Sequence, residues 1–589
     1  MRNSFPEVWA PAASAVELVL PASGRREPME AAEGGWWRAR HELAPGTDYA
    51  FALDGGPSLP DPRSAWQPRG VHGPSRTFDP TAHEWADGGW AGRSSLGAVI
   101  YELHVGTFTP EGTLDAAVAR LDHLADLGVD MVELMPVAAF PGAAGWGYDG
   151  VALYAVHEAY GGPAALQRFV DAAHGRGIAV CLDVVYNHLG PSGNYLGSFG
   201  PYFTDRHSTP WGAAVNLDGD DAAEVRAFVV DNALRWLRDF HVDALRLDAV
   251  HALVDDSPRH VLAELSDAVA ALEREVGRPL SLIAESDLND ARMVTPTSAG
   301  GFGMTAQWDD DVHHALHALV TGERHGYYVD FGGPGTLAKA LREVFVHDGT
   351  YSTFRGKDWG APVPPDVDAR RFVVFSQDHD QVGNRALGDR PSRVLTPGQL
   401  AGSAAVVLLG PYTPMLFMGE EWGATTPFQY FTDHEPELGE LVRQGRQKEF
   451  GTHGWAELYG GEVAVPDPQD PGTVAASRLD WAERDAPEHA RLLEFYRGLI
   501  SLRHEVPDIA SGDRSATAVE VAEDGAWLLL RRGGLAVVVG LSDAAVTVPL
   551  AEDDGPDPEL LLSWGEAGLA GDGARGVRLE GHCVAVVRG

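Results

Sequence analysis

The chain has little that would cross-link it or anchor it in a membrane. Among its 589 residues are two cysteines, Cys181 and Cys583, which lie far apart in the sequence. Two cysteines argue against a disulfide framework or a cysteine-based metal site. The longest apolar run, at about residues 404–409, is much shorter than a membrane-spanning helix. The N-terminal stretch lacks the basic segment and apolar core of a secretory signal, so we expect a soluble cytoplasmic protein.

Positive charge is also scarce. Lys and Arg number 45 against 85 Asp and Glu, a formal net charge of −40. A surface this acidic repels phosphate backbones and anionic lipids, which argues against nucleic acid and membranes as partners. A neutral sugar polymer is indifferent to that sign. Hydrophobic residues make up 44% of the chain and there are 16 Trp, enough to build sizeable cores.

The length predicts about two to four domains. Residues 1–92 alternate short apolar runs with turns, which predicts an N-terminal immunoglobulin-like β-sandwich. Residues 509–589 return to this texture and predict a small C-terminal β-domain. Residues 93–508 lie between them as the predicted catalytic domain.

The central region alternates β-branched runs with amphipathic helices. Eight candidate strands occupy residues 99–105, 131–137, 178–186, 243–250, 281–286, 302–310, 371–380 and 413–419. Eight strand–helix units predict a (β/α)8 TIM barrel, with a doubly wound open sheet as the alternative. The segment 113–128 is predicted to be one helix with Ala125 on its apolar face.

Two predicted strands end in carboxylates. Arg246 and Asp248 are two positions apart on the fourth strand, so they share one face, and the guanidinium would keep Asp248 ionised as a nucleophile requires. Glu285 ends the apolar run of the fifth strand, where apolar neighbours raise a carboxyl pKa as a general acid needs. Taken singly, each has a plainer alternative: a structural ion pair, and the first solvated residue after a strand.

The third and seventh strands also end in polar groups. Asp378, His379 and Asp380 follow the seventh strand, after which Gly383 is predicted to supply a turn before Asn384. Burying so many polar side chains after an apolar strand costs free energy, which favours a functional role for them. The alternative is a network of hydrogen bonds that only holds the loop together.

On the third strand, Asp183 is predicted to face the barrel interior and bond Arg246 or His188. Asn187 and His188 could form a metal-ligand fragment, but the chain shows no EF-hand-like loop. We expect neither a metal nor a cofactor. Aromatic side chains in strand-end loops, Tyr148, Trp146 and Trp211, are candidate stacking surfaces for sugar rings, although any one of them taken alone is better explained by ordinary packing.

Four ordered blocks resemble the α-amylase family. They lie at 183–188, 244–251, 283–287 and 375–380. The resemblance implies retaining cleavage of an α-glucan, with Asp248 as nucleophile, Glu285 as acid/base and Asp380 as transition-state stabiliser. Retention requires nucleophile and acid/base about 5–5.5 Å apart, which neighbouring strand ends can supply.

The same resemblance assigns the sugar contacts. It implies that Arg246, His188 and His379 hold the sugar at the cleaved position, with Tyr148 beneath it and Asp183 as a supporting carboxylate. A non-catalytic barrel should have lost one of the essential carboxylates, and all three are present.

Several stretches resemble the maltooligosyltrehalose trehalohydrolases within that family. They lie at 284–290, 305–323, 375–385, 428–438 and 442–450. The resemblance implies a maltooligosyltrehalose substrate, cleaved at the α-1,4 bond next to its terminal trehalose. Glucan branching enzyme and isoamylase-type debranching hydrolase are the alternatives. His251 stands where α-amylases often have Lys, so we predict that His251, Asp287 and residues 425–450 select the trehalose side.

Overall fold

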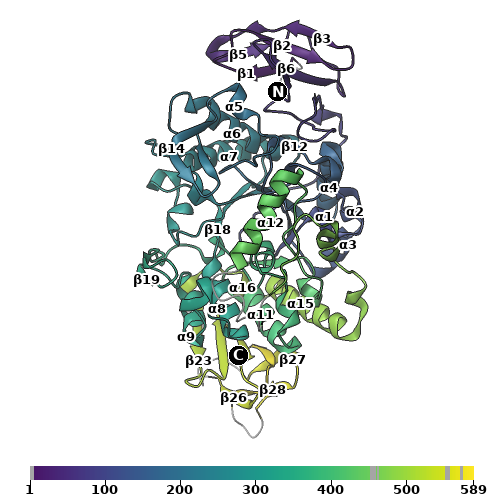
Figure 1. Ribbon diagram of the computed structural model, residues 1–589. Coiled ribbons are helices and arrows are strands. Elements are labelled where there is room, and N and C mark those ends of the chain that lie inside the picture. The colour runs from purple at the N-terminus through teal and green to yellow at the C-terminus, as the bar shows by residue number, and fades with distance from the viewer. Residues whose placement is uncertain (1–4, 451–458, 460–462, 551–556, 571–574, 589) are drawn as a thin grey trace.

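The computed structural model describes residues 5–450, 459, 463–550, 557–570 and 575–588. Strands at the N-terminal end lie at one end of the molecule, the barrel occupies the middle and the C-terminal strands lie at the other end (Figure 1). The domain boundaries predicted above, 1–92, 93–508 and 509–589, remain our proposal.

The N-terminal part consists of two small antiparallel sheets. One has the order β1 (Glu7–Trp9), β5 (Trp36–Arg38), β4 (Glu30–Ala31), and the other β3 (Arg25–Pro28), β2 (Val16–Leu20), β6 (Asp48–Leu53), β7 (Ser58–Leu59). Val16, Leu18 and Phe51 are buried between them, because alternate residues of each strand point inward.

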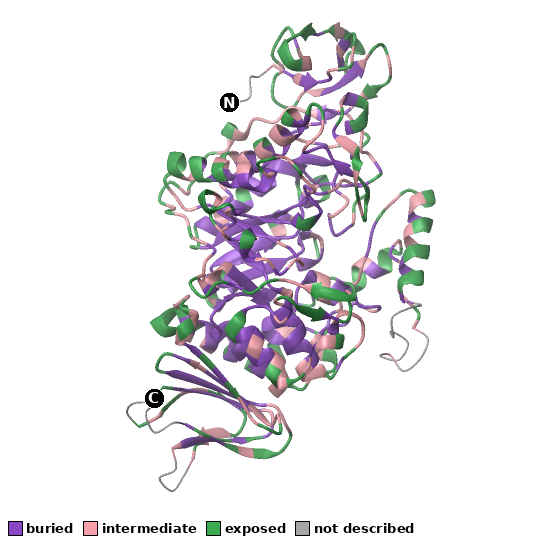
Figure 2. Ribbon diagram, turned by 90° about the vertical axis from the view of Figure 1, so that its left-hand side faces the viewer, coloured by how far each residue is buried: buried purple, intermediate pink, exposed green. Residues whose placement is uncertain are grey.

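Eight parallel strands close into a barrel at the predicted positions. In order they are β9 (Ile100–Leu103), β10 (Met131–Leu134), β13 (Ala179–Val184), β16 (Ala244–Leu247), β17 (Ser281–Ala284), β18 (Ala306–Trp308), β21 (Phe372–Phe375) and β22 (Thr413–Phe417). β22 pairs with β9 through Met415 and Ile100, so the alternative of an open sheet is wrong. Both faces of each strand are buried (Figure 2), which explains why the strands read as nearly continuous apolar runs.

The predicted helix over 113–128 is wrong in one respect. The structure has two short helices, α2 (Leu114–Val118) and α3 (Leu121–Leu127). At the break the backbone N–H groups of Ala119 and Arg120 bond to carbonyls three residues back, and the Arg120 guanidinium carbon lies 4.3 Å from the ring centroid of Trp481. The second helix therefore starts in a new phase, and Ala125, predicted to be buried, is exposed.

Longer helices surround the barrel. They include α4 (Gly162–His174), α6 (Ala222–Asp239), α7 (Val261–Val276), α8 (Asp310–Thr321), α11 (Pro397–Leu409) and α15 (Pro487–Glu505). Two hairpins interrupt the connections. One is β14 (Phe203–Thr209) with β15 (Gly212–Val215), in the loop after β13, and the other is β19 (Thr350–Ser352) with β20 (Lys357–Trp359), between helix α9 (Pro334–Glu343) and β21. Helix α12 (Pro436–Phe450) belongs to the long segment after β22.

The C-terminal part again has two antiparallel sheets. One runs β23 (Thr517–Val521), β24 (Trp527–Arg532), β25 (Leu535–Gly540), β30 (Val584–Arg588), β27 (Glu559–Trp564), and the other β26 (Ala545–Pro549), β29 (Gly576–Glu580), β28 (Ala567–Leu569). Cys181 in the barrel and Cys583 here are both buried free thiols. Among the helices of the described residues, none is long and apolar enough to cross a membrane.

Candidate active site

Asp248 lies at the carboxyl end of β16 with both carboxylate oxygens held. Arg246, fully buried inside the barrel, donates from Nη1 to Asp248 Oδ1 at 2.9 Å and to Asp183 Oδ2 at 2.8 Å. Asn187 donates from Nδ2 to Asp248 Oδ2 at 2.8 Å. The Asp183–Arg246 contact predicted from the sequence is present. The Asp248 carboxylate is thus fixed in orientation at the barrel mouth, as an attacking group requires.

Glu285 follows β17 and meets the same guanidinium. Its Oε2 lies 3.6 Å from Arg246 Nη2 and accepts the backbone N–H of Ala249 at 2.5 Å. Ala249 adopts left-handed backbone geometry, φ 38° and ψ 52°, which costs a non-glycine residue about 1–3 kcal/mol and is typical of active sites. Burial raises the pKa of Glu285 to about 8, with Arg246 opposing the shift and Asp248 adding to it. The raised pKa predicted for this residue is therefore confirmed.

This pKa makes a prediction for the pH dependence of turnover. A carboxyl with a pKa near 8 is protonated at neutral pH and can act as an acid, and it loses that proton as the pH rises through 8. We expect kcat/KM for the free enzyme to fall above about pH 8. Initial rates from pH 5 to 10 at low substrate concentration check this prediction. A fall of kcat/KM that already begins near pH 5 would contradict it.

The polar group after β21 forms the opposite wall. Asp378 caps the short helix α10 (His379–Gly383) by accepting the N–H of Gln381. Asp380 is half-exposed, lies 3.6 Å from His379 Nε2 through its Oδ1, and accepts Asn384 Nδ2 at 3.1 Å. Burial raises the pKa of Asp378 well above its ordinary value. The neighbouring Glu102 raises it further, and His379 lowers it. Asp380 is the carboxylate of this group that remains open to a ligand.

Gly383 does not form the predicted turn. It ends α10 without left-handed geometry, and a Cβ there would lie 2.2 Å from the ring of Trp146. Trp146 is only 5% exposed and stacks on Phe428 at a centroid distance of 5.2 Å. Trp146 therefore packs behind α10, and its faces are not open to a sugar ring.

Replacing Gly383 with alanine should destabilise this wall. The added methyl group must displace Trp146 from a packed position, and overpacking of this kind costs about 1–3 kcal/mol. We expect a lower melting temperature and weaker activity, measured by thermal denaturation and initial rates. Gly445→Ala is the matched control, because Gly445 is exposed in α12 and its Cβ would meet no atom within 4 Å. Equal melting temperatures for the two variants would contradict the packing role.

The predicted sugar-contacting residues gather around this centre. The Tyr148 hydroxyl donates to Asp183 Oδ2 at 2.5 Å and lies 2.7 Å from His379 Nε2. The His188 Nδ1 lies 2.5 Å from Asn187 Oδ1, and its ring stacks on Trp211 with centroids 4.4 Å apart. Trp211, in the turn of the β14–β15 hairpin, is 49% exposed and is therefore available to a ligand.

The residues predicted for the trehalose side fall into two places. His251 Nδ1 lies 3.7 Å from Asp287 Oδ1. Arg355, in the turn of the β19–β20 hairpin, also contacts Asp287, with its Nη2 3.3 Å from Asp287 Oδ2. Trp359 Nε1 donates to the Asp287 carbonyl at 2.7 Å. By contrast, α12 packs behind α10, where Arg446 donates to the Gly383 carbonyl at 2.7 Å.

Three further residues of the site were missed from the sequence. Trp308 lies inside the barrel with its ring centroid 4.3 Å from the Arg246 guanidinium carbon. Burial, with Asp380 and Asp311, raises the pKa of Asp310 to about 7. Glu102 accepts hydrogen bonds from His379. The signal for Glu102 was a single charged residue at an inward position of an apolar strand.

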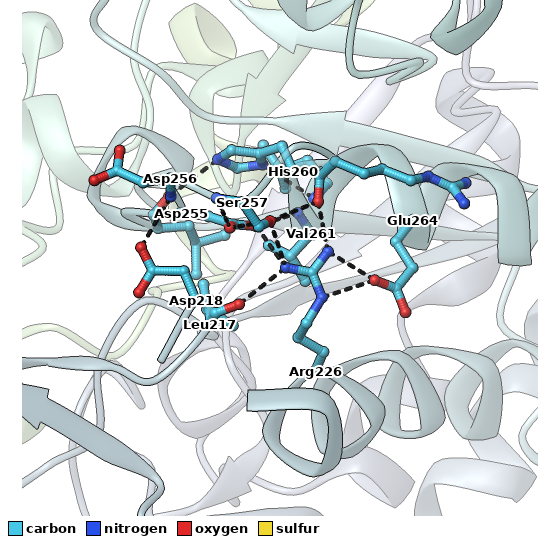
Figure 3. Close-up of polar contacts among 12 residues, drawn as sticks. Leu217, Asp218, Arg226, Asp255, Asp256, Ser257, His260, Val261 and Glu264 are labelled. Atoms are coloured by element: carbon cyan, nitrogen blue, oxygen red, sulfur yellow. Dashed lines mark hydrogen bonds and ion pairs between the residues drawn. The ribbon is translucent and has the colours of Figure 1, made fainter. Parts of the chain in front are cut away.

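One group of possible metal ligands occurs among the described residues. His207, Asp218 and Asp256 place candidate ligand atoms within 4.8 Å of one another. Asp218 is already engaged, since its Oδ2 lies 2.8 Å from His207 Nε2. The same oxygen accepts the Asp256 N–H at 3.0 Å (Figure 3). Close by, Arg226 of α6 donates to Asp255 Oδ2 at 2.7 Å and ties the loop after β16 to that helix. These contacts explain the cluster without a metal ion, because they hold neighbouring loops together. That the protein needs no metal remains a prediction.

The chain is similar to known proteins along its whole length. A family model for the alpha amylase catalytic domain matches residues 74–199. Malto-oligosyltrehalose trehalohydrolase from Arthrobacter ramosus is 55% identical over 593 residues, covering 100% of both chains. The protein of the same name from Mycobacterium tuberculosis is 51% identical, covering 99% of this chain and 98% of that one. A solved structure from Salmonella typhimurium described as an alpha amylase has a TM-score of 0.88 at 38% identity, covering 99% and 97%.

Proposed function

Because the chain belongs to the malto-oligosyltrehalose trehalohydrolases of the α-amylase family, we propose that it hydrolyses the α-1,4-glucosidic bond next to the terminal trehalose of maltooligosyltrehalose. The products are trehalose and a shortened maltooligosaccharide. The observation that carries the chemistry is the contact of one buried guanidinium, Arg246, with both Asp248 and Glu285 at the ends of adjacent strands. That arrangement supports a retaining double displacement.

In the first step Asp248 attacks the anomeric carbon from the face opposite the leaving group. The bond to the trehalose oxygen breaks, and protonated Glu285 gives that oxygen its proton. Asp380 stabilises the positive charge that develops on the ring. Arg246, His188 and His379 hold the sugar hydroxyls, Tyr148 supports the ring, and Asp183 orients Arg246 and Tyr148 through its Oδ2.

In the second step Glu285, now ionised, takes a proton from water. The resulting oxygen attacks the anomeric carbon, the bond to Asp248 breaks, and the product keeps the α configuration. The strained turn at Ala249 supports this reuse of one carboxyl, because its N–H holds Glu285 Oε2 and leaves Oε1 to exchange the proton.

We place the trehalose side at His251 and Asp287. Their proximity, with Arg355 beside Asp287, supports a polar surface beyond the cleaved bond that can bind sugar hydroxyls. A cytoplasmic location, and the absence of nucleic acid and membrane partners, remain proposals that rest on composition alone.

Product analysis tests the function. Chromatography that separates trehalose from maltose should show free trehalose in digests of maltooligosyltrehalose. Hydrolysis of plain maltooligosaccharide, which contains no trehalose to release, should be much slower. Preference for plain maltooligosaccharide without free trehalose would contradict the proposed specificity. New α-1,6 branches would indicate a branching enzyme, and linear chains released from a branched glucan would indicate a debranching enzyme.

A further inference from the structure

Glu102 and His379 form a buried pair beneath the site, and the mechanism above gives Glu102 no part. Glu102 lies on β9 and His379 follows β21, and each is 1% exposed. Glu102 Oε2 accepts the backbone N–H of His379 at 2.9 Å, and Oε1 lies 2.5 Å from its ring Nδ1. One carboxylate therefore fixes both the backbone and the ring of a residue that faces the sugar.

The hydrogen bonds around His379 determine its protonation. The hydroxyl of Tyr148 has one proton, donated to Asp183 Oδ2 at 2.5 Å, and Arg246 donates to the same oxygen. The Tyr148 oxygen therefore faces His379 Nε2, 2.7 Å away, as an acceptor, so Nε2 must carry a proton. Because Nδ1 donates to Glu102, both ring nitrogens are protonated and His379 is a cation.

The electrostatics of the pocket agree with this proton count. Burial alone lowers the pKa of His379, but Glu102, Asp380 and Asp378 raise it to about 10. The titratable and charged groups that face His379 from the surrounding elements are Glu102, Glu133, Asp183, Asp378, Asp380, Tyr148 and His104. Glu102 is the one that accepts two of its hydrogen bonds, from the backbone N–H and from ring Nδ1.

We propose that Glu102 is a positioning residue that holds His379 as a cation, so that the ring keeps a fixed charge beneath the site and a fixed N–H toward Tyr148. The inference rests on the proposed function, because it assigns a task within that reaction. An unbroken series of hydrogen bonds then runs from Glu102 through His379, Tyr148, Asp183 and Arg246 to Asp248. If His379 lost its Nε2 proton, Tyr148 would turn its own proton toward the ring. Asp183 would then lose a donor, and the orientation of Arg246 toward the nucleophile would change.

A second buried glutamate offers a matched control. Glu133 on β10 is paired in register with Glu102, and its oxygens have no nitrogen or oxygen donor among the described residues. Burial, with Glu102 and Asp183, raises its pKa to about 8, so at neutral pH it is a neutral acid. Glu133→Gln therefore exchanges one neutral group for another, whereas Glu102→Gln removes the charge opposite His379.

The kinetic experiment compares Glu102→Gln, Glu102→Asp and Glu133→Gln with the wild type between pH 5.5 and 8.5. The substrates are maltooligosyltrehalose and α-maltotriosyl fluoride, whose cleavage does not depend on trehalose recognition. We expect Glu102→Gln to lower kcat by about 10²-fold at pH 8, comparable to loss of one transition-state donor. The deficit should shrink toward pH 6 as His379, with a pKa nearer the ordinary value of about 6.5, becomes protonated again. Glu102→Asp keeps the charge and should show no such pH dependence. Glu133→Gln should stay within about twofold of the wild type at pH 6, where Glu133 is a neutral acid.

The ring protonation is measured directly by ¹⁵N NMR of histidine-labelled protein, with His379 assigned from the spectrum of a His379→Gln variant. Two protonated ring nitrogens at pH 8 in the wild type, and a neutral ring in folded Glu102→Gln, are the expected result. A neutral ring in the wild type, or a folded Glu102→Gln with the same kcat ratio at pH 6 and pH 8, would overturn the proposal. Wild type that cleaves the fluoride without releasing trehalose would contradict the proposed specificity alone. Wild type that cleaves neither substrate would contradict the proposed function, and the NMR result would still decide the role of Glu102.

Discussion

Asp248→Ala is expected to lower kcat on maltooligosyltrehalose by about 10⁴-fold or more, because the first step loses its nucleophile. The fold should survive the change. Arg246, which would lose one buried partner, keeps Asp183 at 2.8 Å and so is not left as an unpaired buried charge. Trehalose release measured by chromatography gives the rate, and circular dichroism with a thermal melt checks the fold.

Asp256→Ala is the control for this variant. Asp256 lies on the loop after the same strand, its side chain is 74% exposed, and its removal should change kcat by less than about twofold. Azide should partly rescue Asp248→Ala by entering the space of the lost carboxylate and attacking the anomeric carbon from that face, which yields a β-glycosyl azide. Activity within tenfold of the wild type without azide would contradict the assignment of Asp248.

The barrel and its catalytic carboxylates were predictable because their signals are local. A strand buried on both faces reads as an apolar run, and alternation places every second residue inside the barrel. The polar residue that ends such a run must lie at the barrel mouth, which is why Asp248, Glu285 and Asp380 were found without knowledge of the fold's details. The side chains of Arg246 and Asp248 share a face for the same reason.

Contacts between distant segments were not predictable in this way. Glu102 was visible as a charge in an apolar strand, but its partner His379 is 277 positions away and adjoins it only after the barrel closes. Gly383 reads as a turn residue, and only the ring of Trp146 on another loop explains why a side chain is excluded there. At the break between α2 and α3, Arg120 lies against the ring of Trp481, which is far along the chain. In each case the partner residue lies far along the chain, beyond the range of the local pattern from which the prediction was made.

Glu285→Gln should lower kcat on maltooligosyltrehalose by about 10³-fold, within the range attributed to general acid–base catalysis. The amide has the volume of the carboxyl, and its oxygen can still accept the N–H of Ala249, so the backbone at the site should be retained. What is lost is the proton that a sugar leaving group needs. α-Maltotriosyl fluoride needs little protonation, so formation of the glycosyl-enzyme from this substrate should be nearly unimpaired, and a stopped-flow burst of fluoride should precede slow turnover.

Glu133→Gln again separates two explanations, because it makes the same carboxyl-to-amide change at a second buried glutamate whose pKa is also raised to about 8, but which lies within the barrel on β10. A similar loss of kcat in both variants would mean that the barrel tolerates no carboxyl-to-amide change, and would contradict a specific role of Glu285.

Azide provides a further test of the assignment. In Glu285→Gln it replaces water and attacks the glycosyl-enzyme from the face opposite Asp248, which gives an α-glycosyl azide. The anomer therefore reports which face each residue serves: β from Asp248→Ala and α from Glu285→Gln. If both variants gave the same anomer, the two carboxylates would lie on one side of the sugar and a retaining double displacement could not operate between them.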